Sequence, residues 1–278
     1  MSMPADWYPD PSGRHEHRYW DGSRWTEHVA SHGRQSTDFD STSRPPPTVA
    51  RPAEKIVRDV AKARELHPPP PGQTVPMGGG TIFTEPVLVV NQKAKLIELN
   101  NEYAIYDGNG RQLGAVRQVG QSMLKKAVRL IGSYDQFMTH KLQVVDMAGT
   151  VLLAVTRPAK VFKSRILIND ALGQEVGQVV QQNMVGKIRF SLEAGGQPIG
   201  SINAENWRAW NFSVKDHTDT EVARITKTWE GMAKTMFTTA DNYVVQIHRP
   251  LEEPLRTLVV ASALSVDTAL KQDQRGLG

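Results

Sequence analysis

A hairpin pattern that recurs five times is the feature of this sequence that most restricts its fold. In each copy, a run that alternates between apolar and polar residues is followed by a short turn and a second alternating run. The two most similar copies are residues 103–116 (YAIYDGNGRQLGAV) and 166–179 (ILINDALGQEVGQV), and looser copies begin at Leu142, Phe190 and Phe212. Such alternation is typical of a strand with one buried face. We therefore predict five β-hairpins in series.

Asp and Gly at fixed positions of the repeat explain how the hairpins turn. The Asp carboxylate can accept hydrogen bonds from the turn amides, and the Gly can adopt the positive φ that closes the turn. In the fifth copy Asp219 replaces the turn glycine. A small residue after the turn predicts a bulge or a close approach to something central. These small residues are Gly114, Gly177, Gly200 and Ala223.

The number of strands indicates a closed barrel. Five hairpins, with flanking strands near residues 87–90 and 243–248, give about twelve strands. A long antiparallel meander has two edges to hide, and closure removes both of them.

The last apolar segment, residues 254–271, has the character of a helix that begins at Pro254 and is apolar around most of its circumference. Such a helix is buried on all sides or lies in lipid. A bilayer span needs about 20 apolar residues, and this segment is shorter and contains Arg256 and Asp267. We therefore predict a mainly β fold, a twelve-stranded closed antiparallel barrel around a buried C-terminal helix, over residues 81–271.

Composition separates two regions before the barrel. Residues 4–30 are dense in aromatic side chains, and Asp21-Gly22 is a strong hairpin-turn signal, so we predict a small aromatic β-hairpin module. Residues 31–80 are rich in Pro and Gly, which predicts a mostly disordered linker. Within it, residues 52–66 can form a short helix with one apolar face. That face consists of Ile56, Val60 and Ala63.

The aromatic residues Trp7, Tyr19, Trp20 and Trp25 have two interpretations. They can form the core of a very small domain, or they can form a face that binds a peptide or another ligand. The second interpretation makes them candidates for binding a protein partner.

The composition also excludes several classes of function. A formal net charge of +4 is too small to indicate nucleic-acid binding, but it is compatible with an anionic lipid surface. The absence of Cys excludes disulfides, thiolate metal sites and palmitoyl anchors. The sequence has no Walker loop, HExxH or GxSxG motif, so we predict neither an enzyme nor a cofactor. Residues 1–10 lack the pattern of a signal peptide, and we expect a cytoplasmic protein.

Two basic segments are candidates for contact with lipid headgroups. Residues 122–131 have helical spacing, with Lys125, Lys126 and Arg129 opposite an apolar face. A basic amphipathic helix suits an anionic membrane surface, although an ordinary solvated helix has the same pattern. In the second segment, Lys163 and Arg165 share one face of a predicted strand.

The order of these features resembles the phospholipid scramblase and LURP-one-related family. The resemblance rests on residues 87–98 (VLVVNQKAKLIE), on the repeat at 103–116 and on the final apolar helix. It implies the tubby C-terminal type of fold, a twelve-stranded barrel around a central helix. It also implies phospholipid binding, with phospholipid scrambling as the associated activity.

Residues 4–30 resemble domain of unknown function 2510, a small module common in actinobacterial proteins. The resemblance rests on residues 7–11 (WYPDP) and 18–25 (RYWDGSRW). No activity follows from it.

Family scramblases carry an acidic calcium segment just before the last helix. The corresponding residues here, 239–244, keep Asp241 and Asn242, but Thr239 stands at the first acidic position and Val244 at the glycine. Calcium takes about six to eight oxygen ligands, several of them carboxylate. We therefore treat these residues as a degenerate remnant and predict no metal site.

Together, these features predict a protein that binds phospholipids or an anionic membrane surface, peripheral at the inner face of the plasma membrane. The alternative is a cytoplasmic interaction or stress-response scaffold in which the aromatic module recruits a protein partner. An enzyme with a ligand inside the barrel is disfavoured, because the helix fills that space.

Overall fold

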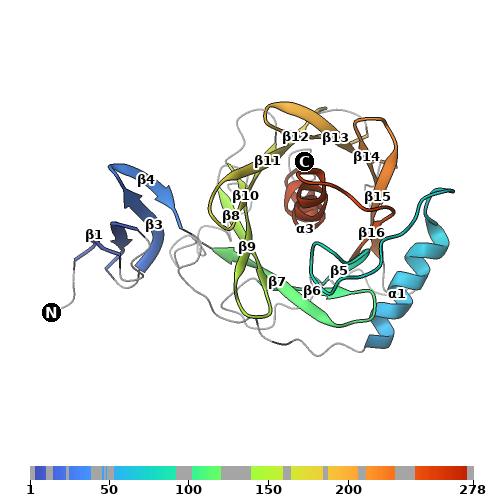
Figure 1. Cartoon of the computed structure of the whole chain (residues 1–278), viewed down its shortest axis with the longest axis horizontal. Helices are drawn as coiled ribbons and strands as arrows, with labels where there is room; N and C mark the ends of the chain where they lie inside the picture. The colour runs from blue at the N-terminus through green and yellow to red at the C-terminus, as the bar shows by residue number, and fades with distance from the viewer. Residues whose placement is uncertain are drawn as a thin grey trace.

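The structure is a computed structural model of the whole chain. It describes residues 4–10, 15–22, 25–38, 46, 48, 53–91, 102–119, 139–158, 164–183, 187–205, 211–228 and 242–273. Within these residues, four strands form an N-terminal sheet and twelve form a closed barrel, with one helix outside the barrel and one inside it (Figure 1).

The N-terminal module is an antiparallel sheet with the strand order β1-β2-β3-β4. Its strands are β1 (Asp6–Pro9), β2 (His17–Trp20), β3 (Trp25–Ser31) and β4 (Arg34–Thr37). The predicted turn joins β2 to β3, where Gly22 has a φ of 94°. The module therefore contains the predicted hairpin and two further strands.

The twelve remaining strands form one closed antiparallel barrel, which confirms the predicted fold class. They are β5 (Val87–Asn91), β6 (Glu102–Asp107), β7 (Gln112–Val119), β8 (His140–Asp146), β9 (Val151–Arg157), β10 (Arg165–Asp170), β11 (Glu175–Gln181), β12 (Arg189–Ala194), β13 (Gln197–Ala204), β14 (Asn211–Asp216), β15 (Glu221–Thr228) and β16 (Asn242–Ile247). Each strand pairs with its sequence neighbours, and the pairing of β16 with β5 closes the ring. Closure leaves no free sheet edge.

The predicted turn chemistry is present in the hairpins. In the β10–β11 turn, Asp170 Oδ1 accepts hydrogen bonds from the amides of Leu172 and Gln174, both at 2.9 Å. Gly173 has a φ of 80°, and Asp219, the substitute for glycine in the fifth hairpin, has a φ of 64°. All five hairpins also have a register shift close to the turn, which confirms the predicted bulges.

The small residues after the turns allow close approach to neighbouring strands and to the helix inside the barrel. A methyl group on Gly177 would lie 2.3 Å from Glu193 O and 3.2 Å from Leu258 Cδ1. A bulkier residue would therefore collide with both the wall and the central helix.

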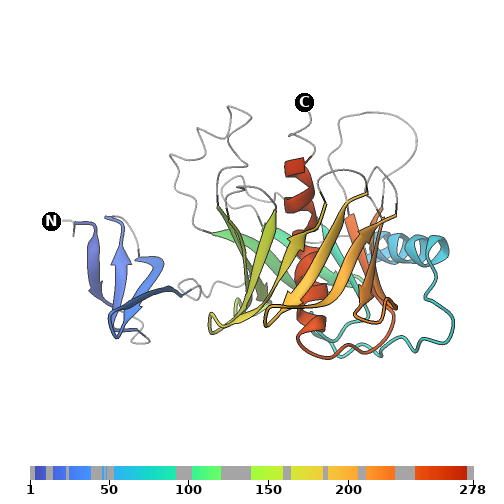
Figure 2. The same ribbon diagram turned by 90° about the horizontal axis from the view of Figure 1, so that it is seen from above.

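Helix α3 (Leu255–Asp273) runs through the barrel, as Figure 2 shows from above. Side chains on all sides of its first half are buried, because the inward-facing residues of the strands surround it. The buried apolar residues are Leu258, Val259, Val260, Ala261, Ala263 and Leu264. The predicted buried helix is thus confirmed.

Helix α1 (Ala53–Leu66) packs on the outside of the barrel, within the range that the sequence analysis assigned to the linker. Its apolar face consists of Ile56, Val60 and Ala63, as the spacing predicted. That face covers outward-facing side chains of β5, β6 and β16. They are Val87, Val89, Ala104, Tyr106 and Val244.

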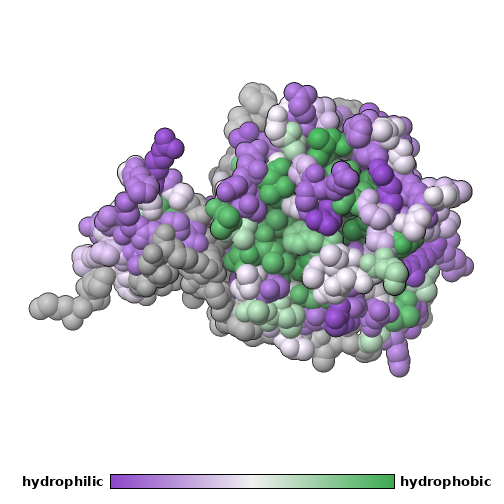
Figure 3. All heavy atoms as spheres, in the orientation of Figure 1, coloured by the Kyte–Doolittle hydropathy of each residue, from purple (hydrophilic) through white to green (hydrophobic). Residues whose placement is uncertain are grey.

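The barrel has two chemically different ends. The five hairpin turns and the start of α3 lie at one end, which we call the Asp-turn end. The other end carries the strand ends that the hairpin turns do not join, such as the end of β9 at Arg157 and the start of β10 at Arg165. We call it the long-connection end. Figure 3 views the Asp-turn end, where hydrophobic residues gather around the centre. Neither helix of the described residues has the length and apolarity needed to cross a membrane.

Candidate functional site

Five cations lie at the long-connection end of the neighbouring strands β8 to β12. They are Lys141 in β8, Arg157 at the end of β9, Arg165 at the start of β10, and Lys187 and Arg189 at the start of β12. Arg165, Lys187 and Arg189 are exposed, Lys141 is half-buried and Arg157 is buried. Among the described residues, no Asp or Glu lies within three positions of these strand ends along the sequence, but Glu27 of the N-terminal module forms an ion pair with Lys141 at 3.8 Å. We call this group the basic rim.

The opposite end of the same five strands is acidic. It carries Asp146, Asp170, Glu175 and Glu193. Two arginines at this end are paired with turn aspartates: Arg111 Nε lies 3.2 Å from Asp107 Oδ2, and Arg249 pairs with Asp216. The Asp residues that close the hairpins therefore also set the sign of the charge at this end. Across β8 to β12, the barrel wall is therefore basic at one end and acidic at the other.

The sequence candidates for lipid contact relate differently to the basic rim. Arg165 lies on it, and its role in lipid contact stays a prediction. Lys125, Lys126, Arg129 and Lys163 lie outside the described residues. Lys187 and Arg189 were not among the sequence candidates, because their relation to Arg165 depends on which strand ends share one end of the barrel.

The degenerate calcium segment is described only in part. Asp241 lies outside the described residues, and Asn242 is described as the first residue of β16 without its side chain. Elsewhere in the described part of the chain, no group of three or more His, Asp or Glu side chains is placed to hold a metal ion.

The aromatic candidates separate onto the two faces of the N-terminal sheet, because successive strand residues point to opposite faces. Trp7 and Tyr19 pair across β1 and β2 with ring centroids 5.4 Å apart. Trp20 and Trp25 pair across β2 and β3 with centroids 5.3 Å apart. All four side chains are half-buried. The four candidates therefore form two pairs and not one patch.

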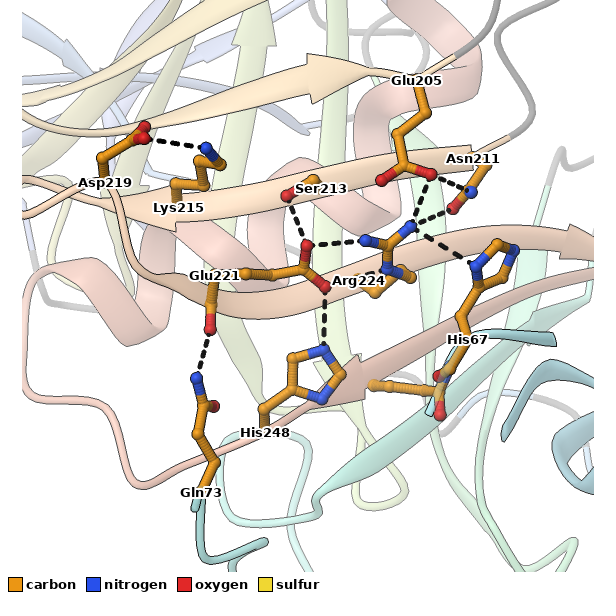
Figure 4. Close-up of polar contacts among 11 residues, drawn as sticks. His67, Gln73, Glu205, Asn211, Ser213, Lys215, Asp219, Glu221, Arg224 and His248 are labelled. Carbon is orange, nitrogen blue, oxygen red and sulfur yellow. Dashed lines mark hydrogen bonds and ion pairs between the residues drawn. The ribbon is translucent and has the colours of Figure 1, made fainter. Parts of the chain in front are cut away.

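A polar network on the outside of the barrel joins β14, β15 and β16 to the chain that follows α1 (Figure 4). At its centre, Glu221 and Arg224 of β15 form two hydrogen bonds. Ser213 Oγ donates to Glu221 Oε2 at 2.6 Å, and His248 Nε2 lies 3.3 Å from Glu221 Oε1. These partners come from three adjacent strands or their ends, so the barrel wall itself assembles the network.

Arg224 also contacts groups on the side away from Glu221. Its Nη1 lies 2.8 Å from Glu205 Oε2 and 3.1 Å from Asn211 Oδ1. The same nitrogen lies 3.5 Å from Nδ1 of His67, the residue after α1. Further along that segment, Gln73 Nε2 donates to the backbone oxygen of Glu221 at 2.7 Å. The network thus anchors residues 67–73 to the barrel.

The charges of the network stabilise one another. Burial opposes ionisation of Glu221, but hydrogen bonds with His248, Arg224 and Ser213 outweigh it and lower the pKa of Glu221 from 4.5 to about 2. Burial and the nearby Arg224 lower the pKa of His67. A carboxylate with a pKa this low is a poor general base near neutral pH. The arrangement is suited to holding the segment after α1 in place, and its chemistry does not indicate catalysis.

These features define the class of protein: a closed twelve-stranded antiparallel barrel around an apolar helix, in which β8 to β12 carry opposite charges at their two ends. Comparison with known family models identifies the family to which the chain belongs. The sequence model of the Scramblase family matches residues 68–270, and the chain belongs to this family. A second family model, described as protein of unknown function (DUF2510), matches residues 5–49. Both agree with the resemblances noted from the sequence.

Two curated relatives are similar to this chain. Phospholipid scramblase family protein C343.06c of Schizosaccharomyces pombe is 24% identical over 182 residues, which cover 59% of this chain and 47% of that protein. Altered inheritance rate of mitochondria protein 25 of Saccharomyces cerevisiae is 24% identical over 197 residues, which cover 60% of this chain and 59% of that protein. The chain therefore spans less than two thirds of the length of either relative.

Among solved structures, an X-ray structure of an Arabidopsis thaliana protein is similar to this chain. It covers 70% of this chain and 99% of its own, with 14% identity and a TM-score of 0.40.

Proposed function

We propose that this scramblase-family protein binds anionic phospholipid surfaces through the basic rim, with the barrel axis directed toward the membrane. The separation of charge along the barrel is the observation that carries the proposal. Exposed Arg165, Lys187 and Arg189 lie at one end, and the turn aspartates lie at the other. An anionic surface attracts the first end and repels the second.

Barrel topology relates the sequence candidates to the same end. Lys125, Lys126 and Arg129 fall between β7 and β8 in the sequence, and Lys163 falls between β9 and β10. Both connections begin and end at the long-connection end. We include these four cations in the proposed membrane-binding surface, and we propose the inner face of the plasma membrane as the surface that it contacts.

Removing the three exposed cations of the basic rim tests the proposal. Each cation near an anionic surface contributes about 1 kcal/mol. Replacing Arg165, Lys187 and Arg189 together with Gln should therefore weaken binding to phosphatidylserine-containing vesicles by about a hundredfold. Binding is measured by flotation of the full chain with vesicles of phosphatidylcholine alone or with phosphatidylserine. Added salt should weaken wild-type binding, because exposed charges are screened over about 8–10 Å.

Helix α1 offers a control with the same change in net charge. Arg58, Lys62 and Arg64 are exposed on α1, away from the barrel ends. Their replacement with Gln removes three positive charges and preserves helix propensity. Equal loss of binding in both triple variants would show that only net charge matters and would contradict the basic rim as the contact surface. Binding that is indifferent to phosphatidylserine would contradict the proposal as a whole.

We also propose a specific activity for the membrane-bound protein, phospholipid scrambling, because the chain belongs to the Scramblase family. Reconstitution into vesicles with a fluorescent phospholipid tests it. Faster exchange between leaflets in the presence of the protein supports scrambling, whereas binding without exchange would restrict the function to surface attachment.

A protein-interaction scaffold is the second candidate function, and the N-terminal module favours it. Its aromatic candidates are half-buried, so part of each ring is open to a protein partner. They are Trp7, Tyr19, Trp20 and Trp25.

A further inference from the structure

The N-terminal module lies beside the wall of the barrel that contains β8 and β9 (Figure 1, Figure 2). An ion pair connects the two parts: Lys141 Nζ of β8 lies 3.8 Å from Glu27 Oε1 of β3. The side chain of Lys141 is 23% exposed and that of Glu27 is 18% exposed. Most of the surface of both charged side chains is covered, so the pair is part of a contact between the module and the barrel.

The module presents Glu27 to the barrel and uses other carboxylates internally. Arg18 Nε donates to Asp10 Oδ1 at 2.8 Å, and Arg18 also pairs with Asp38. The backbone of Glu27 is held in place as well, because its oxygen accepts a hydrogen bond from the amide of Asp38 at 2.7 Å. The carboxylate of Glu27 therefore projects from a fixed point of the module toward Lys141.

On the barrel side, the ion pair involves a member of the basic rim. Lys141 faces outward, since its neighbour Leu142 faces the interior. Lys141 lies opposite Thr156 of β9, and Thr156 lies opposite Leu167 of β10. Two strand spacings, about 10 Å, therefore separate Lys141 from β10, where Arg165 faces outward two residues before Leu167. Because exposed charges are screened over about 8–10 Å, Glu27 also lowers the positive potential near Arg165.

The charges of the two parts favour their contact. The net charge of +4 divides into −2 for residues 1–38, which contain six Asp or Glu and four Arg, and +6 for residues 39–278. A partly exposed ion pair is weak, but the covalent connection raises the effective concentration of the module at the barrel. Such a contact forms readily within one chain, and a surface with many anionic groups can still displace it.

We propose that the N-terminal module is an intramolecular partner of the basic rim and competes with anionic phospholipid for Lys141 and the cations near it. This inference rests on the proposed lipid binding by the basic rim and adds its regulation. While Glu27 is paired with Lys141, the rim is partly neutralised. When the rim lies on an anionic surface, lipid phosphate groups take the place of the carboxylate and the module leaves Lys141.

Glu27→Gln tests the competition, because it removes the carboxylate that neutralises Lys141. One additional cation near an anionic surface should make the full chain bind phosphatidylserine-containing vesicles about fivefold more tightly in flotation. Glu16→Gln is the matched control, because it changes the net charge equally but Glu16 pairs within the module, 3.3 Å from His32 Nδ1. It should change the affinity by less than about twofold. In a chain that carries Lys141→Gln, Glu27→Gln should no longer increase the affinity.

Carbodiimide cross-linking measures the contact in the wild-type chain, because the reagent couples a carboxylate directly to a neighbouring amine. We expect mass spectrometry to detect a cross-link between Glu27 and Lys141, with a lower yield in the presence of phosphatidylserine-containing vesicles than with phosphatidylcholine vesicles. Asp219 and Lys215 provide an internal standard, since they lie 2.9 Å apart at the Asp-turn end. Their cross-link should form equally with both kinds of vesicle.

The outcomes separate this inference from the proposed function. If the wild type binds phosphatidylserine-containing vesicles and Glu27→Gln binds no more tightly, the inference is wrong and lipid binding by the basic rim stands. An equal gain in Glu27→Gln and Glu16→Gln would show that only net charge matters and would also overturn it. Absence of the Glu27–Lys141 cross-link beside a normal Asp219–Lys215 cross-link would exclude the contact, and a yield that phosphatidylserine does not lower would exclude the competition. If neither the wild type nor Glu27→Gln binds these vesicles, the proposed function is contradicted and the regulation inferred from it is overturned with it.

Discussion

Arg224 Nε and Nη2 donate to the two carboxylate oxygens of Glu221, three residues earlier in β15, at 2.8 Å and 2.6 Å. This paired geometry lies on the outside of the barrel, and residues 67–73 lie against it. The side chains are 16% exposed for Glu221 and 10% for Arg224. Because water reaches them only in part, the pair contributes more to stability than an open surface ion pair would.

Glu221→Gln tests this contribution. The substitution keeps the size of the side chain but leaves Arg224 without one of its charged partners, and we expect the free energy of unfolding to fall by about 1–3 kcal/mol. Urea denaturation measures it. Asp219→Asn is the control, since Asp219 forms an ion pair with Lys215 but is 82% exposed. Asn tolerates the positive φ at this position, so this change should cost less than about 1 kcal/mol. Equal effects would show that partial burial does not strengthen the Glu221 pair.

The network also predicts how stability depends on pH. The folded-state pKa of Glu221, about 2, is below the ordinary value of 4.5, so its contribution is fully present above pH 4.5 and is lost as pH falls toward 2. The pKa of His67 is also lowered from 6.5, so the folded state resists its protonation and stability already begins to fall as pH drops below 6.5. Urea midpoints from pH 7 to pH 3 should show both losses.

Two variants can distinguish the loss of stability due to Glu221 from the loss due to His67. Glu221→Gln should remove part of the loss below pH 4.5, and His67→Gln should remove part of the loss that begins at pH 6.5. If both variants kept the pH profile of the wild type, other titrating groups would have to account for it.

The packing of α1 on the barrel gives a third prediction. Ile56 is fully buried against the outer face of the barrel, whereas its neighbour Val57 is 47% exposed. Ile56→Ala should lower the free energy of unfolding by about 2–4 kcal/mol, because it leaves a cavity under the helix. Val57→Ala, measured in the same denaturant series, should change it by less than about 0.5 kcal/mol. Similar small values for both would indicate that α1 contributes little to the stability of the barrel.

The hairpins and the buried helix could be predicted because their signals are local. Asp170 and Gly173 mark a turn within eight residues of chain, and the apolar circumference of α3 excludes a solvated helix. The position of α1 could not be predicted in the same way, because it depends on the outer face of β5, β6 and β16, which are distant in the sequence. A usable signal was present in β5, where Leu88 faces the interior and Val89 faces α1. A strand that is apolar on both faces needs a cover on its outer side.

The candidate site was harder to predict, because barrel closure brings its members together. His67, Glu221 and His248 are far apart in the sequence, and no motif connects them. The basic rim has the same origin: Arg165 was identified from its own segment, but Arg189 becomes its neighbour only through the order of β10, β11 and β12. The spacing of residues along the chain is enough to predict each hairpin, but the surfaces depend on which strands pair in the barrel.

A glycine follows the turn in three of the five hairpins, as Gly114, Gly177 and Gly200, and leads to the last prediction. A methyl group on Gly200 would lie 2.6 Å from the backbone oxygen of Lys215 and 3.3 Å from Leu255 Cδ1 at the start of α3. A backbone oxygen in a closed barrel cannot move away without shifting its strand, so Gly200→Ala should destabilise the protein by about 1–3 kcal/mol. Gly108→Ala is the matched control, because its added methyl group would meet only the Val87 side chain, at ordinary distances of 3.5 Å and 3.7 Å. Thermal melting of the two variants measures the difference. The fifth hairpin has Ala223 at the equivalent position, fully buried, so the requirement for glycine depends on the neighbouring strand and on α3. If Gly200→Ala melts at the wild-type temperature, the wall and the central helix are less tightly packed than these distances require, and glycine at this position would reflect the bulge alone.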